Sequence, residues 1–205
     1  MGAFLAVAQG SANEPAFITL EMNAGRDDLP TVVLVGKGVT FDSGGLSLKT
    51  RDGMIPMKSD MAGAAAVLGA VQAAASSELP LHPVGVCPCV VALGNGVAAG
   101  LFSNDDALRD RLERAGAITA ERVWPLPLYD DYRRTIDSKV ADVQNSGGRE
   151  GGVGTPAAFL QAFVDYPWAH LDIAGMALSE RPDGYRPEGA TGFGVRLLVE
   201  ALRSW

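Results

Sequence analysis

Short apolar runs bounded by glycine, proline or aspartate alternate along the chain with longer stretches rich in alanine or leucine. Residues 16–22 (AFITLEM) and 31–35 (TVVLV) have the length and composition of β-strands. The second run is apolar on both faces, which is typical of a central strand between layers of helices. Residues 84–93 predict one or two further buried strands, and residues 168–174 (WAHLDIA) alternate as a strand does.

The longer stretches between these runs predict helices. Residues 61–75 (MAGAAAVLGAVQAAA) are too many for a strand and are rich in alanine, which favours a closely packed helix. Thr155 followed by Pro156 is typical of a helix start, and this helix is expected to run to about residue 164. A closing helix has an apolar face formed by Val195, Leu198, Val199 and Leu202.

One further helix is predicted over residues 103–115, which carry an apolar stripe at i, i+4 and i+7. Ser103 and Asp106 resemble a capping box at its start, and Gly116 is suited to end it. Strands that alternate with helices in this way predict an α/β layered sheet.

The composition limits the classes of protein to which the chain can belong. Its 205 residues suffice for one domain, and with 47% hydrophobic residues the chain can bury a core. The 17 basic residues against 24 acidic ones give a net charge of −7, which argues against nucleic-acid and anionic-lipid partners. No run of about 18 apolar residues is present, and the first residues lack the basic start of a signal peptide. We therefore expect a cytoplasmic protein without a membrane segment.

The two cysteines, Cys87 and Cys89, are only one residue apart. Such neighbours cannot join distant parts of a fold, so a reducing compartment is expected. They lie in an apolar run without a second cysteine or histidine pair, which favours buried, unreactive thiols over a metal site.

The residues best suited to chemistry gather between Gly36 and Asp60, directly after the strand predicted over residues 31–35. Two carboxylates and several lysines on glycine-rich turns can build a cation site with a positive group beside it. The glycine spacing matches neither a P-loop nor a dinucleotide-binding motif, which argues against phosphate binding. A solvated, glycine-rich surface loop is the alternative that the residues alone leave open.

Long motifs in this region resemble the metal-binding core of the leucyl aminopeptidase (cytosol aminopeptidase) family: VGKGVTFDSGGLSLK and MKSDMAGAAAVLGA. The likeness continues in GNGVAAGLFSNDDAL, ERVWPLPLYDDY, SGGREGG, WAHLDIAG and GATGFGVRLL, and so covers nearly the whole chain. The resemblance implies a three-layer α/β/α fold with a mixed, mostly parallel sheet. It also implies a single catalytic domain over residues 1–205, without the separate N-terminal domain of the family.

The resemblance assigns roles to individual residues. It implies that Lys37, Asp42 and Asp60 ligate metal, with Asp42 bridging two ions. It implies that Lys49 stabilises the transition state and contacts substrate, and that Met57 lines the pocket for the substrate side chain. A lysine, whose ordinary pKa is about 10.4, can ligate a metal only as a neutral amine. Lys49 as an ammonium is suited to face a developing oxyanion.

The family hydrolyses the N-terminal residue of peptides and favours leucine and other apolar residues. It uses two zinc, manganese or magnesium ions and assembles as hexamers. We therefore expect a peptide substrate, a divalent metal cofactor and a homo-oligomer.

One departure from the family pattern bears on activity. The sequence VGVCP joins CVVALG directly at Pro88–Cys89, where the family carries a long segment with NTDAEGRL and DVATLTGA. By the resemblance, NTDAEGR supplies two metal ligands and the arginine that holds a bicarbonate base. The missing segment also carries central strands, so the sheet is expected to be shortened. The donors that remain are expected to hold one metal ion or none.

The sequence thus predicts a metallo-aminopeptidase domain with impaired or absent activity. A non-catalytic subunit that keeps the oligomer contacts of the family is an alternative. Another alternative is that the chain has been shortened, by a deletion in the gene, by an error in the gene model or by design.

The strand predicted over residues 168–174 carries two polar residues, His170 and Asp172. His170 is interpreted as a core or interface histidine rather than a ligand. Asp172 is expected to satisfy a neighbouring backbone group or arginine.

Overall fold

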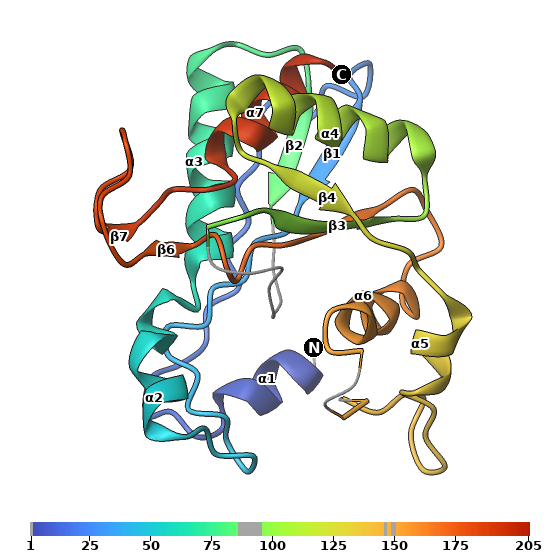
Figure 1. The fold of residues 1–205 in the computed structure, drawn as a ribbon. Coiled ribbons are helices and arrows are strands. Elements are labelled where there is room, and N and C mark those ends of the chain that lie inside the picture. Colours follow the sequence, from blue (N-terminus) through green and yellow to red (C-terminus); the bar gives the residue numbers. More distant parts are fainter. Residues whose placement is uncertain (1, 86–95, 146, 149–150) are drawn as a thin grey trace.

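The computed structural model describes residues 2–85, 96–145, 147–148 and 151–205, and Figure 1 shows their arrangement. The helices are α1 (Gly2–Ala8), α2 (Arg51–Met54), the 3₁₀ helix η1 (Ile55–Ser59), α3 (Ala62–Ser76), α4 (Asp106–Thr119), α5 (Asp130–Arg134), α6 (Gly154–Gln161) and α7 (Val195–Arg203). The strands are β1 (Thr31–Leu34), β2 (His82–Gly85), β3 (Ala99–Ser103), β4 (Val123–Pro125), β5 (Ala169–Asp172), β6 (Leu178–Ser179) and β7 (Gly189–Ala190).

The strands form a mixed set of sheets. In the described part of the chain, β1 pairs in parallel with β2, and β3 lies between parallel β4 and antiparallel β5. Strands β6 and β7 form a separate antiparallel pair. The predicted α/β fold with a mixed sheet is confirmed, but its strands are divided among sheets of two, three and two strands.

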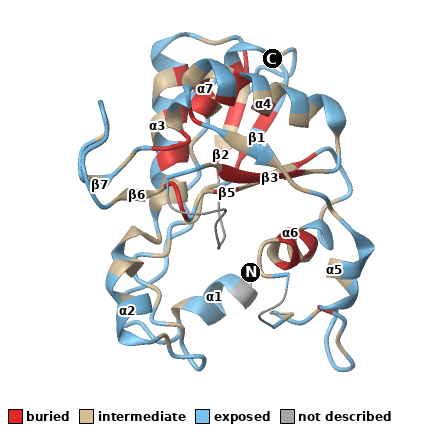
Figure 2. Cartoon of the chain, in the orientation of Figure 1, coloured by how far each residue is buried: buried red, intermediate tan, exposed pale blue. Residues whose placement is uncertain are grey.

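Helices α3 and α7 cover one face of the β1–β2 sheet (Figures 1 and 2). This core contains Val32, Leu34, Val67, Ala70, Val71, Ala74, Leu81, Val199 and Leu202. On the opposite face Val33 is 59% exposed and Val35 is 53% exposed. The interpretation of residues 31–35 as a strand is therefore confirmed, whereas burial on both faces is wrong, because the described helices cover one face and leave Val33 and Val35 exposed.

The three-stranded sheet is covered on both faces. Helices α4 and α7 pack on one side, in a core formed by Leu101, Leu112, Ala115, Leu197 and Ala201. On the other side, Phe102, Ala157 and Trp168 form a cluster that includes α6. The three-layer arrangement is complete at this sheet. Helix α7 connects this sheet to the β1–β2 sheet, because it packs against both α4 and α3.

The helix predictions hold over most of their length. Residues 61–75 form α3, residues 155–164 overlap α6, and the closing helix is α7. Thr155 is not the cap of α6, because the helix begins at Gly154 and the Thr155 hydroxyl donates to the Gly151 carbonyl.

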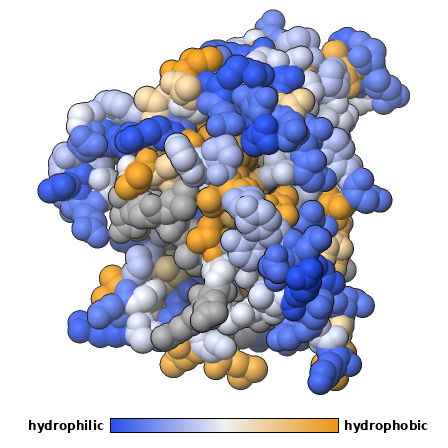
Figure 3. Space-filling view, turned by 45° about the vertical axis from the view of Figure 1, so that its right-hand side comes forward, coloured by the Kyte–Doolittle hydropathy of each residue, from blue (hydrophilic) through white to orange (hydrophobic). Residues whose placement is uncertain are grey.

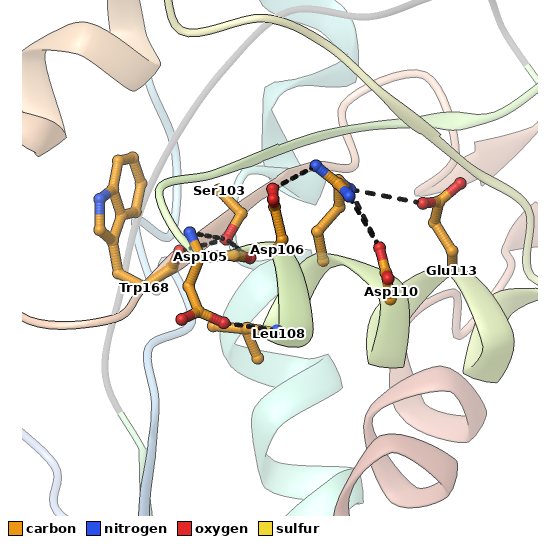
Figure 4. Close-up of polar contacts among 8 residues, drawn as sticks. Ser103, Asp105, Asp106, Leu108, Asp110, Glu113 and Trp168 are labelled. Carbon is orange, nitrogen blue, oxygen red and sulfur yellow. Dashed lines mark hydrogen bonds and ion pairs between the residues drawn. The ribbon is translucent and has the colours of Figure 1, made fainter.

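Helix α4 begins and ends differently from the prediction. Asp105 caps it, since its carboxylate accepts a 2.7 Å hydrogen bond from the amide of Leu108 (Figure 4). The Ser103 hydroxyl instead donates to the carbonyl of Trp168, and thereby ties the end of β3 to the strand beside it. The helix passes Gly116 and ends at Thr119, before a left-handed Ala120.

The strand predicted over residues 16–22 does not form. Its single pairing is an isolated bridge between Glu21 and Val84, and Phe17 and Ile18 are exposed. An apolar run becomes a strand only where a neighbour supplies backbone partners, and among the described residues none lies along this segment. Residues 169–172 do form β5, and the strand predicted over 84–93 coincides with β2 only at residues 84–85. The rest of that prediction, with Cys87, Cys89 and the Pro88–Cys89 join, lies outside the described residues.

Within the part of the chain that the structure describes, no helix has the length and apolar character that a membrane crossing requires.

Candidate metal and catalytic site

Two glycines bring the loop after β1 against the start of α3. A Cβ atom on Gly36 would lie 2.2 Å from the carbonyl oxygen of Gly63, and one on Gly63 would lie 2.8 Å from the backbone nitrogen of Lys37. The Ala64 amide donates a 2.8 Å hydrogen bond to the Lys37 carbonyl. Because glycine has no Cβ, the two backbones can touch, and this contact holds Lys37 beside the N-terminal end of α3.

Lys37 forms an ion pair with Asp60, which directly follows η1. The Nζ atom of Lys37 lies 2.7 Å from Oδ1 of Asp60, and the two side chains are only 14% and 12% exposed. The other oxygen, Oδ2, is buried and has no hydrogen-bond partner among the described residues. One oxygen of this carboxylate is thus neutralised by Lys37, while the other is a free acceptor.

Asp42 and Lys49 form a second ion pair on the same loop, 3.0 Å apart. Oδ1 of Asp42 also accepts a 2.8 Å hydrogen bond from the amide of Gly44. Gly44 has a φ of 90°, and a Cβ there would lie 2.3 Å from the Ser47 carbonyl oxygen, so this turn requires glycine. The turn directs the aspartate and the lysine toward each other.

The electrostatics of Asp42 link the two pairs. Burial by itself raises its pKa, but the hydrogen bonds from Lys49 and the Gly44 amide, with the charges of Lys49 and Lys37, hold the pKa below its ordinary value. Because the charge of Lys37 also acts on Asp42, the two ion pairs belong to one cluster of two lysines and two aspartates.

A cavity of about 530 Å³ opens beside this cluster. Lys37, Lys49, Met57 and Asp60 line one part of it, and Asp42 lies behind them in its ion pair with Lys49. Most of the remaining lining is apolar and comes from β1, β5, α3, α4, α6 and α7. Figure 3 shows apolar surface exposed in the middle of one face of the molecule, with polar surface around it. The structure therefore brings the five residues singled out in the sequence to one place.

A row of buried polar residues lies on β5 and directly before it, and no functional role was predicted for these residues from the sequence. Trp168, His170 and Asp172 are 9%, 6% and 1% exposed. Each has one polar atom (Nε1, Nε2 and Oδ2, respectively) without a hydrogen-bond partner among the residues that the structure describes. Trp168 and His170 line the cavity. The alternation W-x-H-x-D was the available signal, because residues two apart share a face of a strand.

Two interpretations of this row agree with the structure. His170 is buried and stacks on Phe102 with ring centroids 6.1 Å apart, as a core histidine does. Oδ1 of Asp172 accepts a hydrogen bond from the backbone amide of Ala174.

The side chains can offer a limited set of ligands to a metal. Over residues 2–85, 96–145, 147–148 and 151–205, no group of three or more His, Cys, Asp or Glu side chains is placed to hold an ion. The donors in the cluster are the carboxylates of Asp42 and Asp60 and the amine of Lys37. The unpartnered Oδ2 of Asp60 fits a cation, since a buried carboxylate oxygen without a partner is unfavourable.

Comparison with known proteins decides the family. The sequence model described as "Cytosol aminopeptidase family, catalytic domain" matches residues 1–90 and 87–199. The chain belongs to the cytosol aminopeptidase family. The two matched stretches overlap at residues 87–90, which include the Pro88–Cys89 join.

Curated relatives carry the same family name. A probable cytosol aminopeptidase of Roseiflexus castenholzii is 44% identical over 268 aligned positions, covering 100% of this chain and 55% of the relative. One from Geotalea uraniireducens is 42% identical over 266 positions, covering 99% of this chain and 54% of the relative. The chain spans about half the length of the curated relatives that it matches.

Solved structures agree. A bottromycin maturation enzyme, BotP, in complex with Mn matches with a TM-score of 0.80 and 33% identity, over 91% of this chain and 55% of that one. A cytosol aminopeptidase from Coxiella burnetii matches with a TM-score of 0.80 and 28% identity, over 91% of this chain and 54% of the other. The predicted family and fold class are thereby confirmed.

Proposed function

We propose that this chain is a metal-dependent aminopeptidase domain whose activity on peptide N-termini is reduced or lost. The observation that carries the proposal is that two neighbouring ion pairs, Lys37–Asp60 and Lys49–Asp42, lie beside a largely apolar cavity. Lysines paired with carboxylates in this way match the motif residues of the family.

In this proposal Asp42, Asp60 and Lys37 hold a divalent cation such as Mn²⁺, Zn²⁺ or Mg²⁺. A bound divalent cation supplies Lewis acidity and lowers the pKa of water. Lys37 could serve as a ligand only as a neutral amine, and Asp60 would then face the cation in place of its ion pair with Lys37. The carboxylates fit one ion, and the two ions of the family require donors from the motif that this chain lacks.

The other two residues act on the substrate. Lys49 would face the oxygen that becomes negative when the peptide carbonyl is attacked. Met57 offers an apolar contact to the side chain of the N-terminal residue, which suits leucine. The missing base and second ion each contribute orders of magnitude to the rate, so weak turnover or none is expected. Cytoplasmic location and assembly into hexamers are part of the same proposal.

Hydrolysis of a leucine anilide by the purified chain with added Mn²⁺ or Zn²⁺ tests the proposal, together with metal content by mass spectrometry. We expect at most one ion per chain, and any turnover should be abolished by Lys49→Ala. Lys58→Ala is the matched control, because Lys58 is an exposed lysine on η1 close to the site. Two bound ions, or turnover equal to that of a full-length relative, would contradict the proposed impairment. Turnover that survives Lys49→Ala would contradict the assigned role.

A further inference from the structure

The cavity beside the charged cluster lies between the edges of two strands. Five consecutive residues, 31–35, line it from β1, and residues 167–171 line it from β5 and the segment before it. Successive residues of a strand point to opposite faces, so a cavity that touches every one of them lies at the strand edge. Two strand edges thus border one empty volume of about 530 Å³.

Both edges have unpaired backbone groups. Within the described residues β1 pairs with β2 alone, and β5 pairs with β3 alone. Val33 and Val35 of the β1 segment are more than half exposed. A strand edge with exposed apolar side chains is a template for pairing with another strand.

The buried polar atoms point to the same place. Four buried side-chain atoms have no hydrogen-bond partner in the described part of the chain, and three of them belong to the cavity-lining residues Asp60, Trp168 and His170. The fourth belongs to Asp172 on β5. Such atoms are normally paired, because a lost hydrogen bond in the interior is costly. An occupant with polar backbone groups fits this lining better than a purely apolar one does.

The total surface of the chain is larger than that of a compact monomer of the same mass. The chain exposes 12689 Å², whereas a compact monomer of 21.4 kDa exposes about 9,100 Å². The excess is larger than the area buried in a standard protein interface, about 1,600 Å².

The comparisons indicate what kind of occupant fits. The relative from Roseiflexus castenholzii aligns over 268 positions with the 205 residues of this chain, and the family match breaks at residues 87–90. That break directly follows β2, which is the strand beside β1. The additional residues of the relative therefore enter the fold next to the cavity.

We propose that the cavity is an acceptor slot for a strand-forming polypeptide segment supplied by a separate chain. The segment pairs its backbone with the free edges of β1 and β5, covers Val33 and Val35, and offers polar groups to Trp168 and His170. This mode of recognition is strand addition to an exposed sheet edge. The proposal concerns binding and requires neither metal nor catalysis.

The test uses the full chain and, as the probe, the residues of the Roseiflexus castenholzii relative that have no counterpart in this chain at the break in the family match, expressed as a separate polypeptide. Binding is measured by calorimetry and light scattering, and amide hydrogen exchange locates it. We expect a one-to-one complex in which the amides of residues 31–35 and 168–172 become protected. Trp168 fluorescence should change as well.

Two substitutions separate slot binding from non-specific association. Val33→Asp places a charge at the slot and should weaken binding about tenfold or more, since the charge would be buried by the segment. Val140→Asp is the matched control, because Val140 is 96% exposed and lies outside the cavity lining. Val140→Asp should bind the segment like the parent chain. A scrambled version of the segment should not bind the parent chain.

Any of four results would overturn the proposal. The first is that the folded chain does not bind the segment, and the second is that binding protects the amides of other strands from exchange. The third is that Val33→Asp binds the segment as tightly as the parent chain. The fourth is that the chain alone forms a dimer in which the β1 and β5 amides are already protected. The last result would assign the slot to a second copy. Because the readout is binding without metal, its failure is distinguishable from failure of the aminopeptidase proposal.

Discussion

The ammonium group of Lys37 lies 2.7 Å from Oδ1 of Asp60, while Oδ2 of the same carboxylate is buried without a hydrogen-bond partner among the described residues. One carboxylate thus combines a satisfied oxygen with an unsatisfied one beside a cavity. A cation bound to Asp60 would relieve the unsatisfied oxygen and release the lysine. The first prediction follows from this relationship.

Divalent metal should stabilise the folded chain through Asp60. A ligand that binds only the folded state at a hundred times its dissociation constant adds about 2.7 kcal/mol, which raises the melting temperature by about 5–10 °C for a chain of this size. We expect such a rise with Mn²⁺, its reversal by a chelator, and its loss in Asp60→Asn. Asp28→Asn is the control, since Asp28 pairs with Arg26 on the surface. An equal rise in Asp60→Asn would show that the metal binds elsewhere.

The contact of Gly36 with Gly63 should be intolerant of a methyl group. Gly36→Ala would place Cβ 2.2 Å from a backbone oxygen and should lower the free energy of unfolding by about 3 kcal/mol. Gly38→Ala is the matched control, because its Cβ would lie 3.5 Å from the Ala64 Cβ, an ordinary contact. Urea denaturation measures both. If the two variants were equally stable, the close approach of the loop to α3 would not be needed.

Glu121 anchors the start of α7 and should be important for stability. Its side chain is 3% exposed, and it accepts hydrogen bonds from the amides of Gly194 and Leu197 while pairing with Arg196. Glu121→Ala leaves these donors unpaired and should cost about 3 kcal/mol, or about 6–12 °C in melting temperature. Glu113→Ala, which removes a largely exposed pair with Arg109, should cost well under about 1 kcal/mol. Thermal unfolding of the two variants gives the comparison.

His170 and Asp172 should produce opposing pH dependences. Burial lowers the pKa of His170 to about 4, so its contribution to stability is lost as the pH falls from about 6.5 toward 4. Burial raises the pKa of Asp172 to about 6 despite the hydrogen bond from Ala174, so its contribution is present at low pH and lost as the pH rises through 6. The two effects nearly cancel between pH 4 and 6.5.

Single substitutions should expose each effect. In Asp172→Asn the free energy of unfolding should rise with pH over that range by about 3 kcal/mol, and in His170→Gln it should fall by about 3 kcal/mol. The unsubstituted chain should change little. Urea unfolding at a series of pH values measures this, and identical profiles for the three proteins would show that neither group titrates as its burial requires.

Local patterns predicted the elements that have neighbours in the fold. The alanine-rich α3 and the apolar stripe of α4 were predictable because helices satisfy their own backbone hydrogen bonds. The run over residues 16–22 was equally apolar, yet it forms no strand, because a strand depends on a partner that sequence periodicity does not show. The cap of α4 was misassigned for a similar reason, since Ser103 bonds to Trp168 across the sheet.

The candidate site shows the same division. The residues Lys37, Asp42, Lys49, Met57 and Asp60 could be named from the sequence, because they stand in long continuous motifs that resemble those of the family. The pairing of each lysine with its carboxylate could not be predicted from the sequence. Lys37 is 23 positions from Asp60, and their contact depends on the packing of the loop against α3.

The sequence by itself determined the family and the α/β class, and it supplied the candidate site residues through their resemblance to the family motifs, because long motifs and helical periodicity are encoded locally. Only the tertiary structure decided how the strands of the described residues divide into sheets and that a cavity lies between β1 and β5. It alone also showed that Trp168, His170 and Asp172 bury polar atoms that no described residue pairs. The physical reason is that strand pairing, burial and hydrogen-bond satisfaction depend on residues far apart in the chain, and these meet only when the fold is complete.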